Sequence, residues 1–108
     1  MKSVTIITGG RGSGKTRMLY GFLSYRKSIE LGKLSNIKEF VFDLDLEVIG
    51  VDNITYYDID LLRGVINLDL DYDLVLSTDI SVNELKANGF VFPKNTYIIE
   101  TKLIEKIR

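Results

Sequence analysis

Cysteine, histidine and tryptophan are all missing from this chain of 108 residues, and proline occurs only once. Without cysteine the chain can form no disulfide, no thiolate zinc site and no cysteine nucleophile. Without histidine it has no imidazole ligand for a metal, and any general base must be a carboxylate or a water molecule. No apolar run approaches the roughly 20 residues that a membrane-spanning helix needs. We therefore expect a protein without a membrane span, whose acid–base chemistry rests on carboxylates.

Hydrophobic residues make up 45% of the sequence. This composition is typical of a globular protein, and the length suits one domain over residues 1–108. The first residues lead into an apolar segment without a signal peptide, so we expect a cytoplasmic location. Residues 1–38 hold eight bases and one acid, whereas residues 39–84 hold twelve acids and one base. Such asymmetry is compatible with a polyanion-binding face or with self-association into a homo-oligomer.

The most informative stretch lies between an apolar segment at 4–8 and an amphipathic segment that begins near residue 14. It reads Gly9-Gly10-Arg11-Gly12-Ser13-Gly14-Lys15-Thr16 and fits the pattern G-x-x-x-x-G-K-[ST] at every position. Glycines let successive backbone N–H groups turn inward around an anion, and the start of the following helix adds the positive end of its dipole. Lys15 would extend along the phosphates, and Thr16 would offer its hydroxyl to Mg²⁺. The stretch therefore predicts a phosphate-binding loop.

By this Walker A motif the chain resembles the P-loop NTPase superfamily. The resemblance implies that ATP or GTP binds together with Mg²⁺, with Lys15 as a catalytic residue at the phosphates and Thr16 at the metal. The residues implied to contact the nucleotide are Gly9, Gly10, Arg11, Gly12, Ser13, Gly14, Lys15, Thr16 and Arg17. The loop is also similar to that of viral DNA-packaging ATPases, and the strand-first opening is similar to filamentous-phage assembly ATPases. No base-recognition motif accompanies it, so the sequence does not decide whether nucleic acid is a partner.

Segments that suit strands alternate with segments that suit helices along the whole chain. Strands are predicted at 4–8, 39–46, 74–76 and 96–100, while 54–57 reads as a short strand or a buried loop. Helices are predicted from residue 14 to the glycine at 32, at 58–66, from 81 to 88, and over 103–107. Such alternation predicts an α/β fold in three layers, with a mostly parallel sheet of about four to five strands and helices on both faces.

The first predicted helix carries an aromatic stripe. Met18, Phe22, Tyr25 and Ile29 fall on one of its faces, with Leu19 and Leu23 beside them. Apolar residues at this spacing are more typical of a core-facing surface than of a base-stacking platform. We therefore expect the stripe to be buried.

Hydrolysis needs more than the loop, because an acid at the end of a neighbouring strand usually holds the water shell of Mg²⁺. The run Tyr72-Asp73-Leu74-Val75-Leu76-Ser77-Thr78-Asp79 resembles the Y-D-L-V-h-h-D-E rhythm of many P-loop ATPases. In one alignment Thr78 stands at the metal acid and Asp79 at the following glutamate; a slip of one residue makes Asp79 the metal acid. Asp43 is the competing candidate, but the strand directly after a P-loop helix usually lies farther from the metal. We therefore expect Asp79 to be the metal ligand and a catalytic residue.

Either alignment leaves one acid of the pair missing or altered, which favours slow hydrolysis. Glu100 and Thr101, at the end of the last predicted strand, resemble the polar sensor position near the γ-phosphate. Two interpretations stay open. The first is a minimal P-loop NTPase, in the simplest case an ATPase, that works slowly or after assembly with a partner. The second is a nucleotide-binding regulatory or interaction module without turnover.

Overall fold

The computed structural model describes residues 3–10, 12–40, 46–67 and 71–101. Along the chain the elements are β1 (Ser3–Gly9), α1 (Lys15–Leu23), β2 (Ser28–Leu31), the 3₁₀ helix η1 (Leu34–Phe40), β3 (Val48–Ile54), the 3₁₀ turn η2 (Tyr56–Asp58), α2 (Ile59–Asn67), β4 (Asp73–Thr78), α3 (Val82–Ala87) and β5 (Thr96–Thr101). None of the helices in these described residues is both long enough and apolar enough to cross a bilayer.

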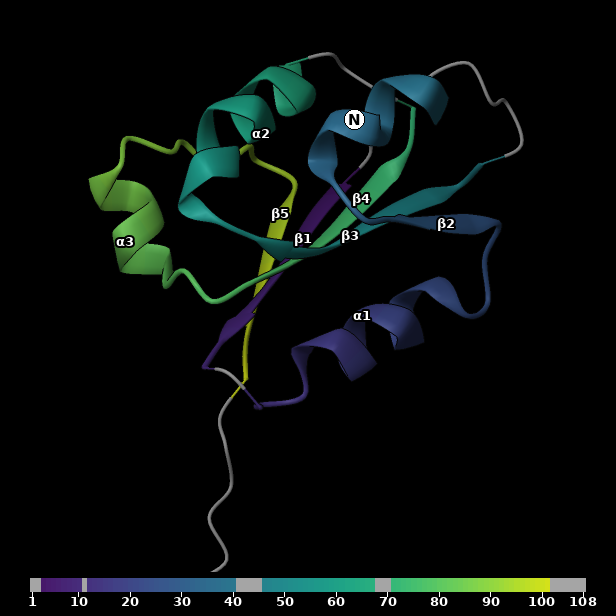
Figure 1. Cartoon of the computed structure of the whole chain (residues 1–108), viewed down its shortest axis with the longest axis horizontal. Coiled ribbons are helices and arrows are strands. Elements are labelled where there is room, and N and C mark those ends of the chain that lie inside the picture. Colours follow the sequence, from purple (N-terminus) through teal and green to yellow (C-terminus); the bar gives the residue numbers. More distant parts are fainter. Residues whose placement is uncertain (1–2, 11, 41–45, 68–70, 102–108) are drawn as a thin grey trace, which may run out of the picture.

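The five strands form one sheet in the order β2-β3-β4-β1-β5, and every neighbouring pair is parallel. Figure 1 shows α1 on one face of this sheet and α2 and α3 on the other. The predicted three-layer α/β fold, with a parallel sheet and helices on both faces, is confirmed. Because all strands are parallel, their carboxyl ends lie at the same edge of the sheet, where ligands bind in folds of this type.

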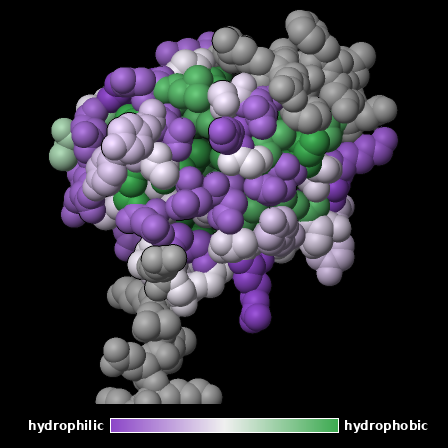
Figure 2. All heavy atoms as spheres, viewed as in Figure 1, coloured by the Kyte–Doolittle hydropathy of each residue, from purple (hydrophilic) through white to green (hydrophobic). Residues whose placement is uncertain are grey.

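Two apolar clusters hold the layers together. Under α1, the side chains of Leu19 and Leu23 pack on a small cluster whose sheet members are Ile7, Val48 and Val75. The opposite face carries the larger cluster, which joins η1, α2 and α3 to the sheet. Its most deeply buried members include Val4, Ile6, Leu34, Ile37, Ile49, Leu62, Leu74, Leu76 and Leu85. Figure 2 shows that hydrophilic residues cover much of the surface in this view, with smaller hydrophobic areas between them.

The helix after the loop is shorter than the sequence predicts. It ends at Leu23, and Ile29 lies in strand β2, which pairs with β3. The prediction of a buried aromatic stripe is wrong, because Phe22 is 41% exposed and Tyr25 is 95% exposed. Leu19 and Leu23 face the sheet instead. A nine-residue helix has only two and a half turns, so one narrow row of side chains reaches the sheet and the adjacent row stays outside.

The strand predicted at 39–46 is also wrong in its described part, since residues 39 and 40 belong to η1. The strand that follows is β3, over residues 48–53 for which no strand is predicted. Gly50 has a packing reason to be there: a Cβ at this position would lie 2.8 Å from Leu23 Cδ1. The absence of a side chain lets the last turns of α1 approach β3 closely.

The remaining elements agree with the sequence. Helix α2, strand β4 and strand β5 lie where they are predicted, and α3 begins after Ser81, whose hydroxyl accepts from Glu84 N at 3.1 Å as the capping box requires. Residues 54–57 contain the end of β3 and the start of η2. The helix predicted over 103–107 lies outside the described residues.

Candidate functional site

The loop between β1 and α1 lies at the carboxyl edge of the sheet. Gly14 is the N-cap of α1 and has a left-handed backbone, with φ of 88°, and Gly12 has φ of 79°. Residues with a Cβ rarely adopt this conformation, so the glycines of the motif are needed for the path of the loop. A turn within the loop is closed by Ser13 N donating to Gly10 O at 3.2 Å. Arg11, which the sequence places among the nucleotide contacts, lies outside the described residues.

The far side of the loop is tied to strand β5. Thr101 Oγ1 donates to Thr8 O at 3.2 Å and lies 2.5 Å from Ser13 Oγ. Because the one proton of Thr101 goes to the carbonyl of Thr8, Ser13 is the donor in the second contact. The backbones meet so closely here that a Cβ on Gly9 would lie 2.1 Å from Thr101 Oγ1. Thr101, whose place in the sequence resembles a sensor position, therefore contacts the loop, and Glu100 beside it is exposed.

An open pocket of about 620 Å³ lies between the loop and the ends of β3 and β4. This volume is in the range of sites for small ligands such as nucleotides. The residues that line it are Gly12, Gly14, Lys15, Thr16, Arg17, Asp52, Asn53, Ser77 and Asp79. Four of the predicted loop residues, together with Arg17 and Asp79, are thus gathered around one space.

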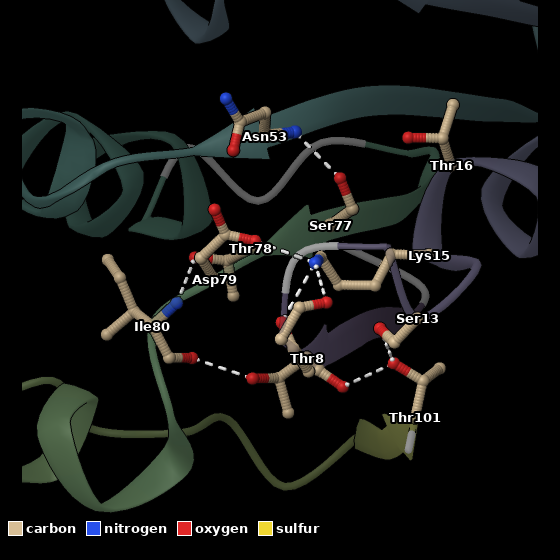
Figure 3. Close-up of polar contacts among 12 residues, drawn as sticks. Thr8, Ser13, Lys15, Thr16, Asn53, Ser77, Thr78, Asp79, Ile80 and Thr101 are labelled. Atoms are coloured by element: carbon tan, nitrogen blue, oxygen red, sulfur yellow. Dashed lines mark hydrogen bonds and ion pairs between the residues drawn. The ribbon is translucent and has the colours of Figure 1, made fainter. Parts of the chain in front are cut away.

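Lys15 is buried at the base of this pocket, with 9% of its surface exposed. Its Nζ donates to Gly9 O at 2.8 Å and to Gly10 O at 2.9 Å, and it forms an ion pair with Asp79 Oδ1 at 2.6 Å. Figure 3 shows the lysine curled back over its own loop toward Asp79. The sequence predicts that Lys15 extends along a phosphate chain; in the structure its amino group is turned onto protein acceptors.

Thr16 faces a different acid. Its hydroxyl donates to Asp52, at 3.0 Å from Oδ2 and 3.2 Å from Oδ1. Asp52 lies near the end of β3, which the order of the sheet sets beside β4, and its carboxylate is half-buried. Asp79 also lines the pocket, but its carboxylate forms an ion pair with Lys15. Asp43 lies outside the described residues. The assignment of the metal to Asp79 stays a prediction, while the geometry brings Asp52 to Thr16.

Ser77, next to the last residue of strand β4, contacts the carboxylate of Asp52 from the other side. It is fully buried, and its hydroxyl donates to Asp52 Oδ1 in a short hydrogen bond while accepting from Asn53 N at 2.7 Å. Asn53 has φ of 65°, a left-handed conformation that asparagine tolerates better than most residues. Two strands and the loop helix thereby fix the orientation of one acid.

Thr78, the other candidate of the β4 alignment, is not in the pocket. It is buried, its hydroxyl donates to Ile54 O at 2.7 Å, and it accepts from Ile80 N at 3.1 Å. Its role in the described structure is to join β4 to the end of β3.

The sequence does contain a signal for Asp52. The run Val48-Ile49-Gly50-Val51 is apolar and is followed by Asp52, much as apolar residues precede Asp43. Gly50 within the run and Asn53 after it are residues that often interrupt a strand, so the pattern is weak. Only the position of β3 in the sheet gives Asp52 its place beside Thr16.

In comparisons with known proteins, no family model matches this chain, and no curated protein matches it. Its function must therefore be argued from the site.

The residues of the pocket suit a magnesium ion bound with a phosphate ligand. A hydroxyl and a carboxylate, on Thr16 and Asp52, lie together and open into the pocket. Mg²⁺ prefers oxygen ligands and keeps several waters, so one carboxylate and the phosphates of a nucleotide are enough to hold it. Within the described residues no cluster of three or more acidic side chains forms a cage for a metal. The site fits a metal that arrives with its ligand rather than one bound by protein alone.

Proposed function

We propose that this protein binds ATP or GTP with Mg²⁺ at the loop 9–16 and hydrolyses it slowly or only after assembly with a partner. The observation that carries the proposal is the contact between the loop hydroxyl of Thr16 and the carboxylate of Asp52, at the rim of a pocket of about 620 Å³. A glycine loop alone could be a turn that binds nothing. A glycine loop with a hydroxyl–carboxylate pair beside it has the two kinds of group that a metal–phosphate ligand needs.

In this proposal the positively charged and the negatively charged groups of the site contact different parts of the ligand. The backbone N–H groups of the loop and of the start of α1 would donate hydrogen bonds to the phosphate oxygens, and the positive charges of Lys15 and Arg17, which line the pocket, would add to the attraction. Thr16 and Asp52 would hold Mg²⁺, which when bound neutralises phosphate charge. Ser77 would keep the Asp52 carboxylate turned toward Thr16.

Slow turnover is argued from what lies next to Asp52. The following residue is Asn53, whose amide cannot take a proton from an attacking water. Of the two carboxylates that line the pocket, Asp52 is bonded to Thr16 and Ser77, and Asp79 is paired with Lys15. Each carboxylate among the described pocket residues therefore already has a partner in this structure, and none stands ready as a base. The same observation favours a second candidate function, a nucleotide-dependent interaction module without turnover.

Calorimetric titration with Mg·ATP and Mg·GTP tests the proposal, with Lys15→Ala as the deficient variant. We expect binding to the wild-type chain and a loss of about tenfold or more in Lys15→Ala, because a charge-assisted contact to phosphate is removed. Asp60→Asn is the control, since Asp60 is on α2 and pairs with Arg63. Circular dichroism establishes that each variant is folded. Equal affinity in wild type and Lys15→Ala would contradict the proposal, and a single-turnover assay then separates an NTPase from a non-hydrolysing module.

A further inference from the structure

The amino group of Lys15 has no donor left for a ligand. A lysine ammonium carries three N–H donors. In this structure Nζ has three acceptors within 2.9 Å: the carbonyls of Gly9 and Gly10 and the carboxylate of Asp79. Two of these acceptors are backbone atoms of the loop itself, and only the third is a mobile side chain. A phosphate that bonds to Lys15 must therefore displace an existing partner, and Asp79 is the partner that can leave.

The backbone around Asp79 is anchored, so the exchange requires a movement of its side chain alone. On one side Ile80 N donates to Thr78 Oγ1 at 3.1 Å, and Thr8 Oγ1 donates to Ile80 O at 2.7 Å. The Asp79 side chain itself is 56% exposed, in contrast to 10% for Lys15. A carboxylate with this much access to water can rotate out of the pocket and be solvated there, whereas the buried ammonium cannot follow it.

We propose that Asp79 is an internal competitor for the phosphate site: its carboxylate occupies Lys15 in the ligand-free protein and must release it before a polyphosphate can bind. This inference rests on the proposed function, because it concerns the same loop. It differs from the sequence-based prediction, in which Asp79 holds the metal and its loss weakens binding. Here the carboxylate opposes the ligand twice, by occupying the ammonium and by placing a negative charge where phosphate charge arrives.

Because Asp79 competes for Lys15, a ligand binds only if it interacts with the lysine more strongly than Asp79 does. An ion pair with one partner open to water is a modest interaction, so a ligand with several phosphate charges can break it. Inorganic phosphate, with a single phosphate group, forms fewer contacts that compensate for the loss of the Lys15–Asp79 ion pair. Asp79 therefore makes the site bind di- and triphosphates in preference to a single phosphate. Between binding events its carboxylate balances the positive charge of Lys15.

The experiment compares wild type, Asp79→Asn and the control Asp60→Asn in calorimetric titrations with inorganic tripolyphosphate and with ATP, each with and without Mg²⁺. Asparagine keeps the size of the side chain but carries no charge. In Asp79→Asn we expect binding of both ligands to tighten about three- to tenfold, with the gain present in the absence of Mg²⁺. A second measurement needs no nucleotide: reaction of Lys15 with an amine-directed acylating reagent, followed by peptide mass spectrometry. We expect Lys15 to react several-fold faster in Asp79→Asn.

The outcomes separate this inference from the proposed function. If wild type binds ATP but Asp79→Asn binds it equally or more weakly, the competitor role is overturned while nucleotide binding stands. If the loss in Asp79→Asn occurs only with Mg²⁺ present, Asp79 acts on the metal side and the inference is again wrong. If neither protein binds tripolyphosphate or ATP, both the proposed function and the competitor role fail. Unchanged reactivity of Lys15 would mean that Asp79 does not shield it.

Discussion

Thr16, the last residue of the glycine loop, donates its hydroxyl to the carboxylate of Asp52, 36 residues further along the chain, at 3.0 Å. The contact joins the first turn of α1 to the end of β3 across the carboxyl edge of the sheet. It exists because β4 alone separates β3 from β1 in the order β2-β3-β4-β1-β5, so the end of β3 lies near the helix that follows β1. Figure 3 shows Thr16 facing the β3–β4 side of the pocket, whereas Lys15 turns toward Asp79. Neighbouring residues of one motif thus engage two different acids.

Asp52→Asn tests which acid serves the metal. We expect this change to lower the affinity for Mg·ATP or Mg·GTP by about tenfold, since a neutral amide replaces the carboxylate on the metal side. Affinity for the nucleotide without Mg²⁺ should stay level or rise slightly, because a negative charge leaves the pocket. Titrations with ATP over a series of Mg²⁺ concentrations measure both effects.

The matched comparison for Asp52→Asn is Asp79→Asn, with Asp43→Asn as a third variant. The proposal assigns the larger loss of magnesium dependence to Asp52. A larger loss in Asp79→Asn or Asp43→Asn would contradict this assignment and would make that acid, one of the two candidates from the sequence, the metal ligand.

Ser77→Ala removes the hydroxyl that holds Asp52 in place. The change leaves Asp52 Oδ1 and Asn53 N without their buried partner, so we expect the free energy of unfolding to fall by about 1–3 kcal/mol. We also expect the magnesium dependence of nucleotide binding to weaken, because the carboxylate can rotate away from Thr16. Chemical denaturation and magnesium titrations measure the two effects separately.

Ser77→Thr is the control for that variant, because it restores the hydroxyl at the cost of one added methyl group in a buried position. It should recover most of the magnesium dependence even if some stability is lost. A variant with threonine that behaves like alanine in the magnesium titration would show that Ser77 acts through packing rather than through its hydrogen bonds.

Gly9→Ala tests the attachment of the loop to β5. The added Cβ would lie 2.1 Å from Thr101 Oγ1 and 2.6 Å from Thr101 O, so either β5 or the loop must move. We expect a loss of about 1–3 kcal/mol in the free energy of unfolding and weaker nucleotide binding, measured by thermal denaturation and calorimetry. Gly10→Ala is the comparison, because a Cβ at Gly10 meets no atom within 4 Å. Equal effects at the two glycines would contradict a role for the contact with Thr101.

The layers of the fold could be predicted because each rests on a local pattern. Apolar runs at 4–8 and 74–76 are buried strands, and the capping box at Ser81 begins α3 as expected. The wrong predictions lie in the first half of the chain and concern the buried aromatic stripe on the first helix and the strand at 39–46. The row of Met18, Phe22 and Tyr25 has the period of a buried helix face, yet the sheet beneath α1 has room only for Leu19 and Leu23.

The glycine loop is the part of the candidate site that the sequence alone predicts, because eight contiguous residues supply its glycines, its lysine and its hydroxyl. The partners of that loop are decided by the tertiary structure. Asp52 lies on β3, Ser77 lies on β4 and Asp79 directly follows β4, and the order of the sheet brings these three residues to the loop after β1. The sequence favours Asp79, because the local pattern does not show which strand end meets Thr16. Strand order separates Asp52 from Asp79, since it brings one carboxylate to Thr16 and the other to Lys15.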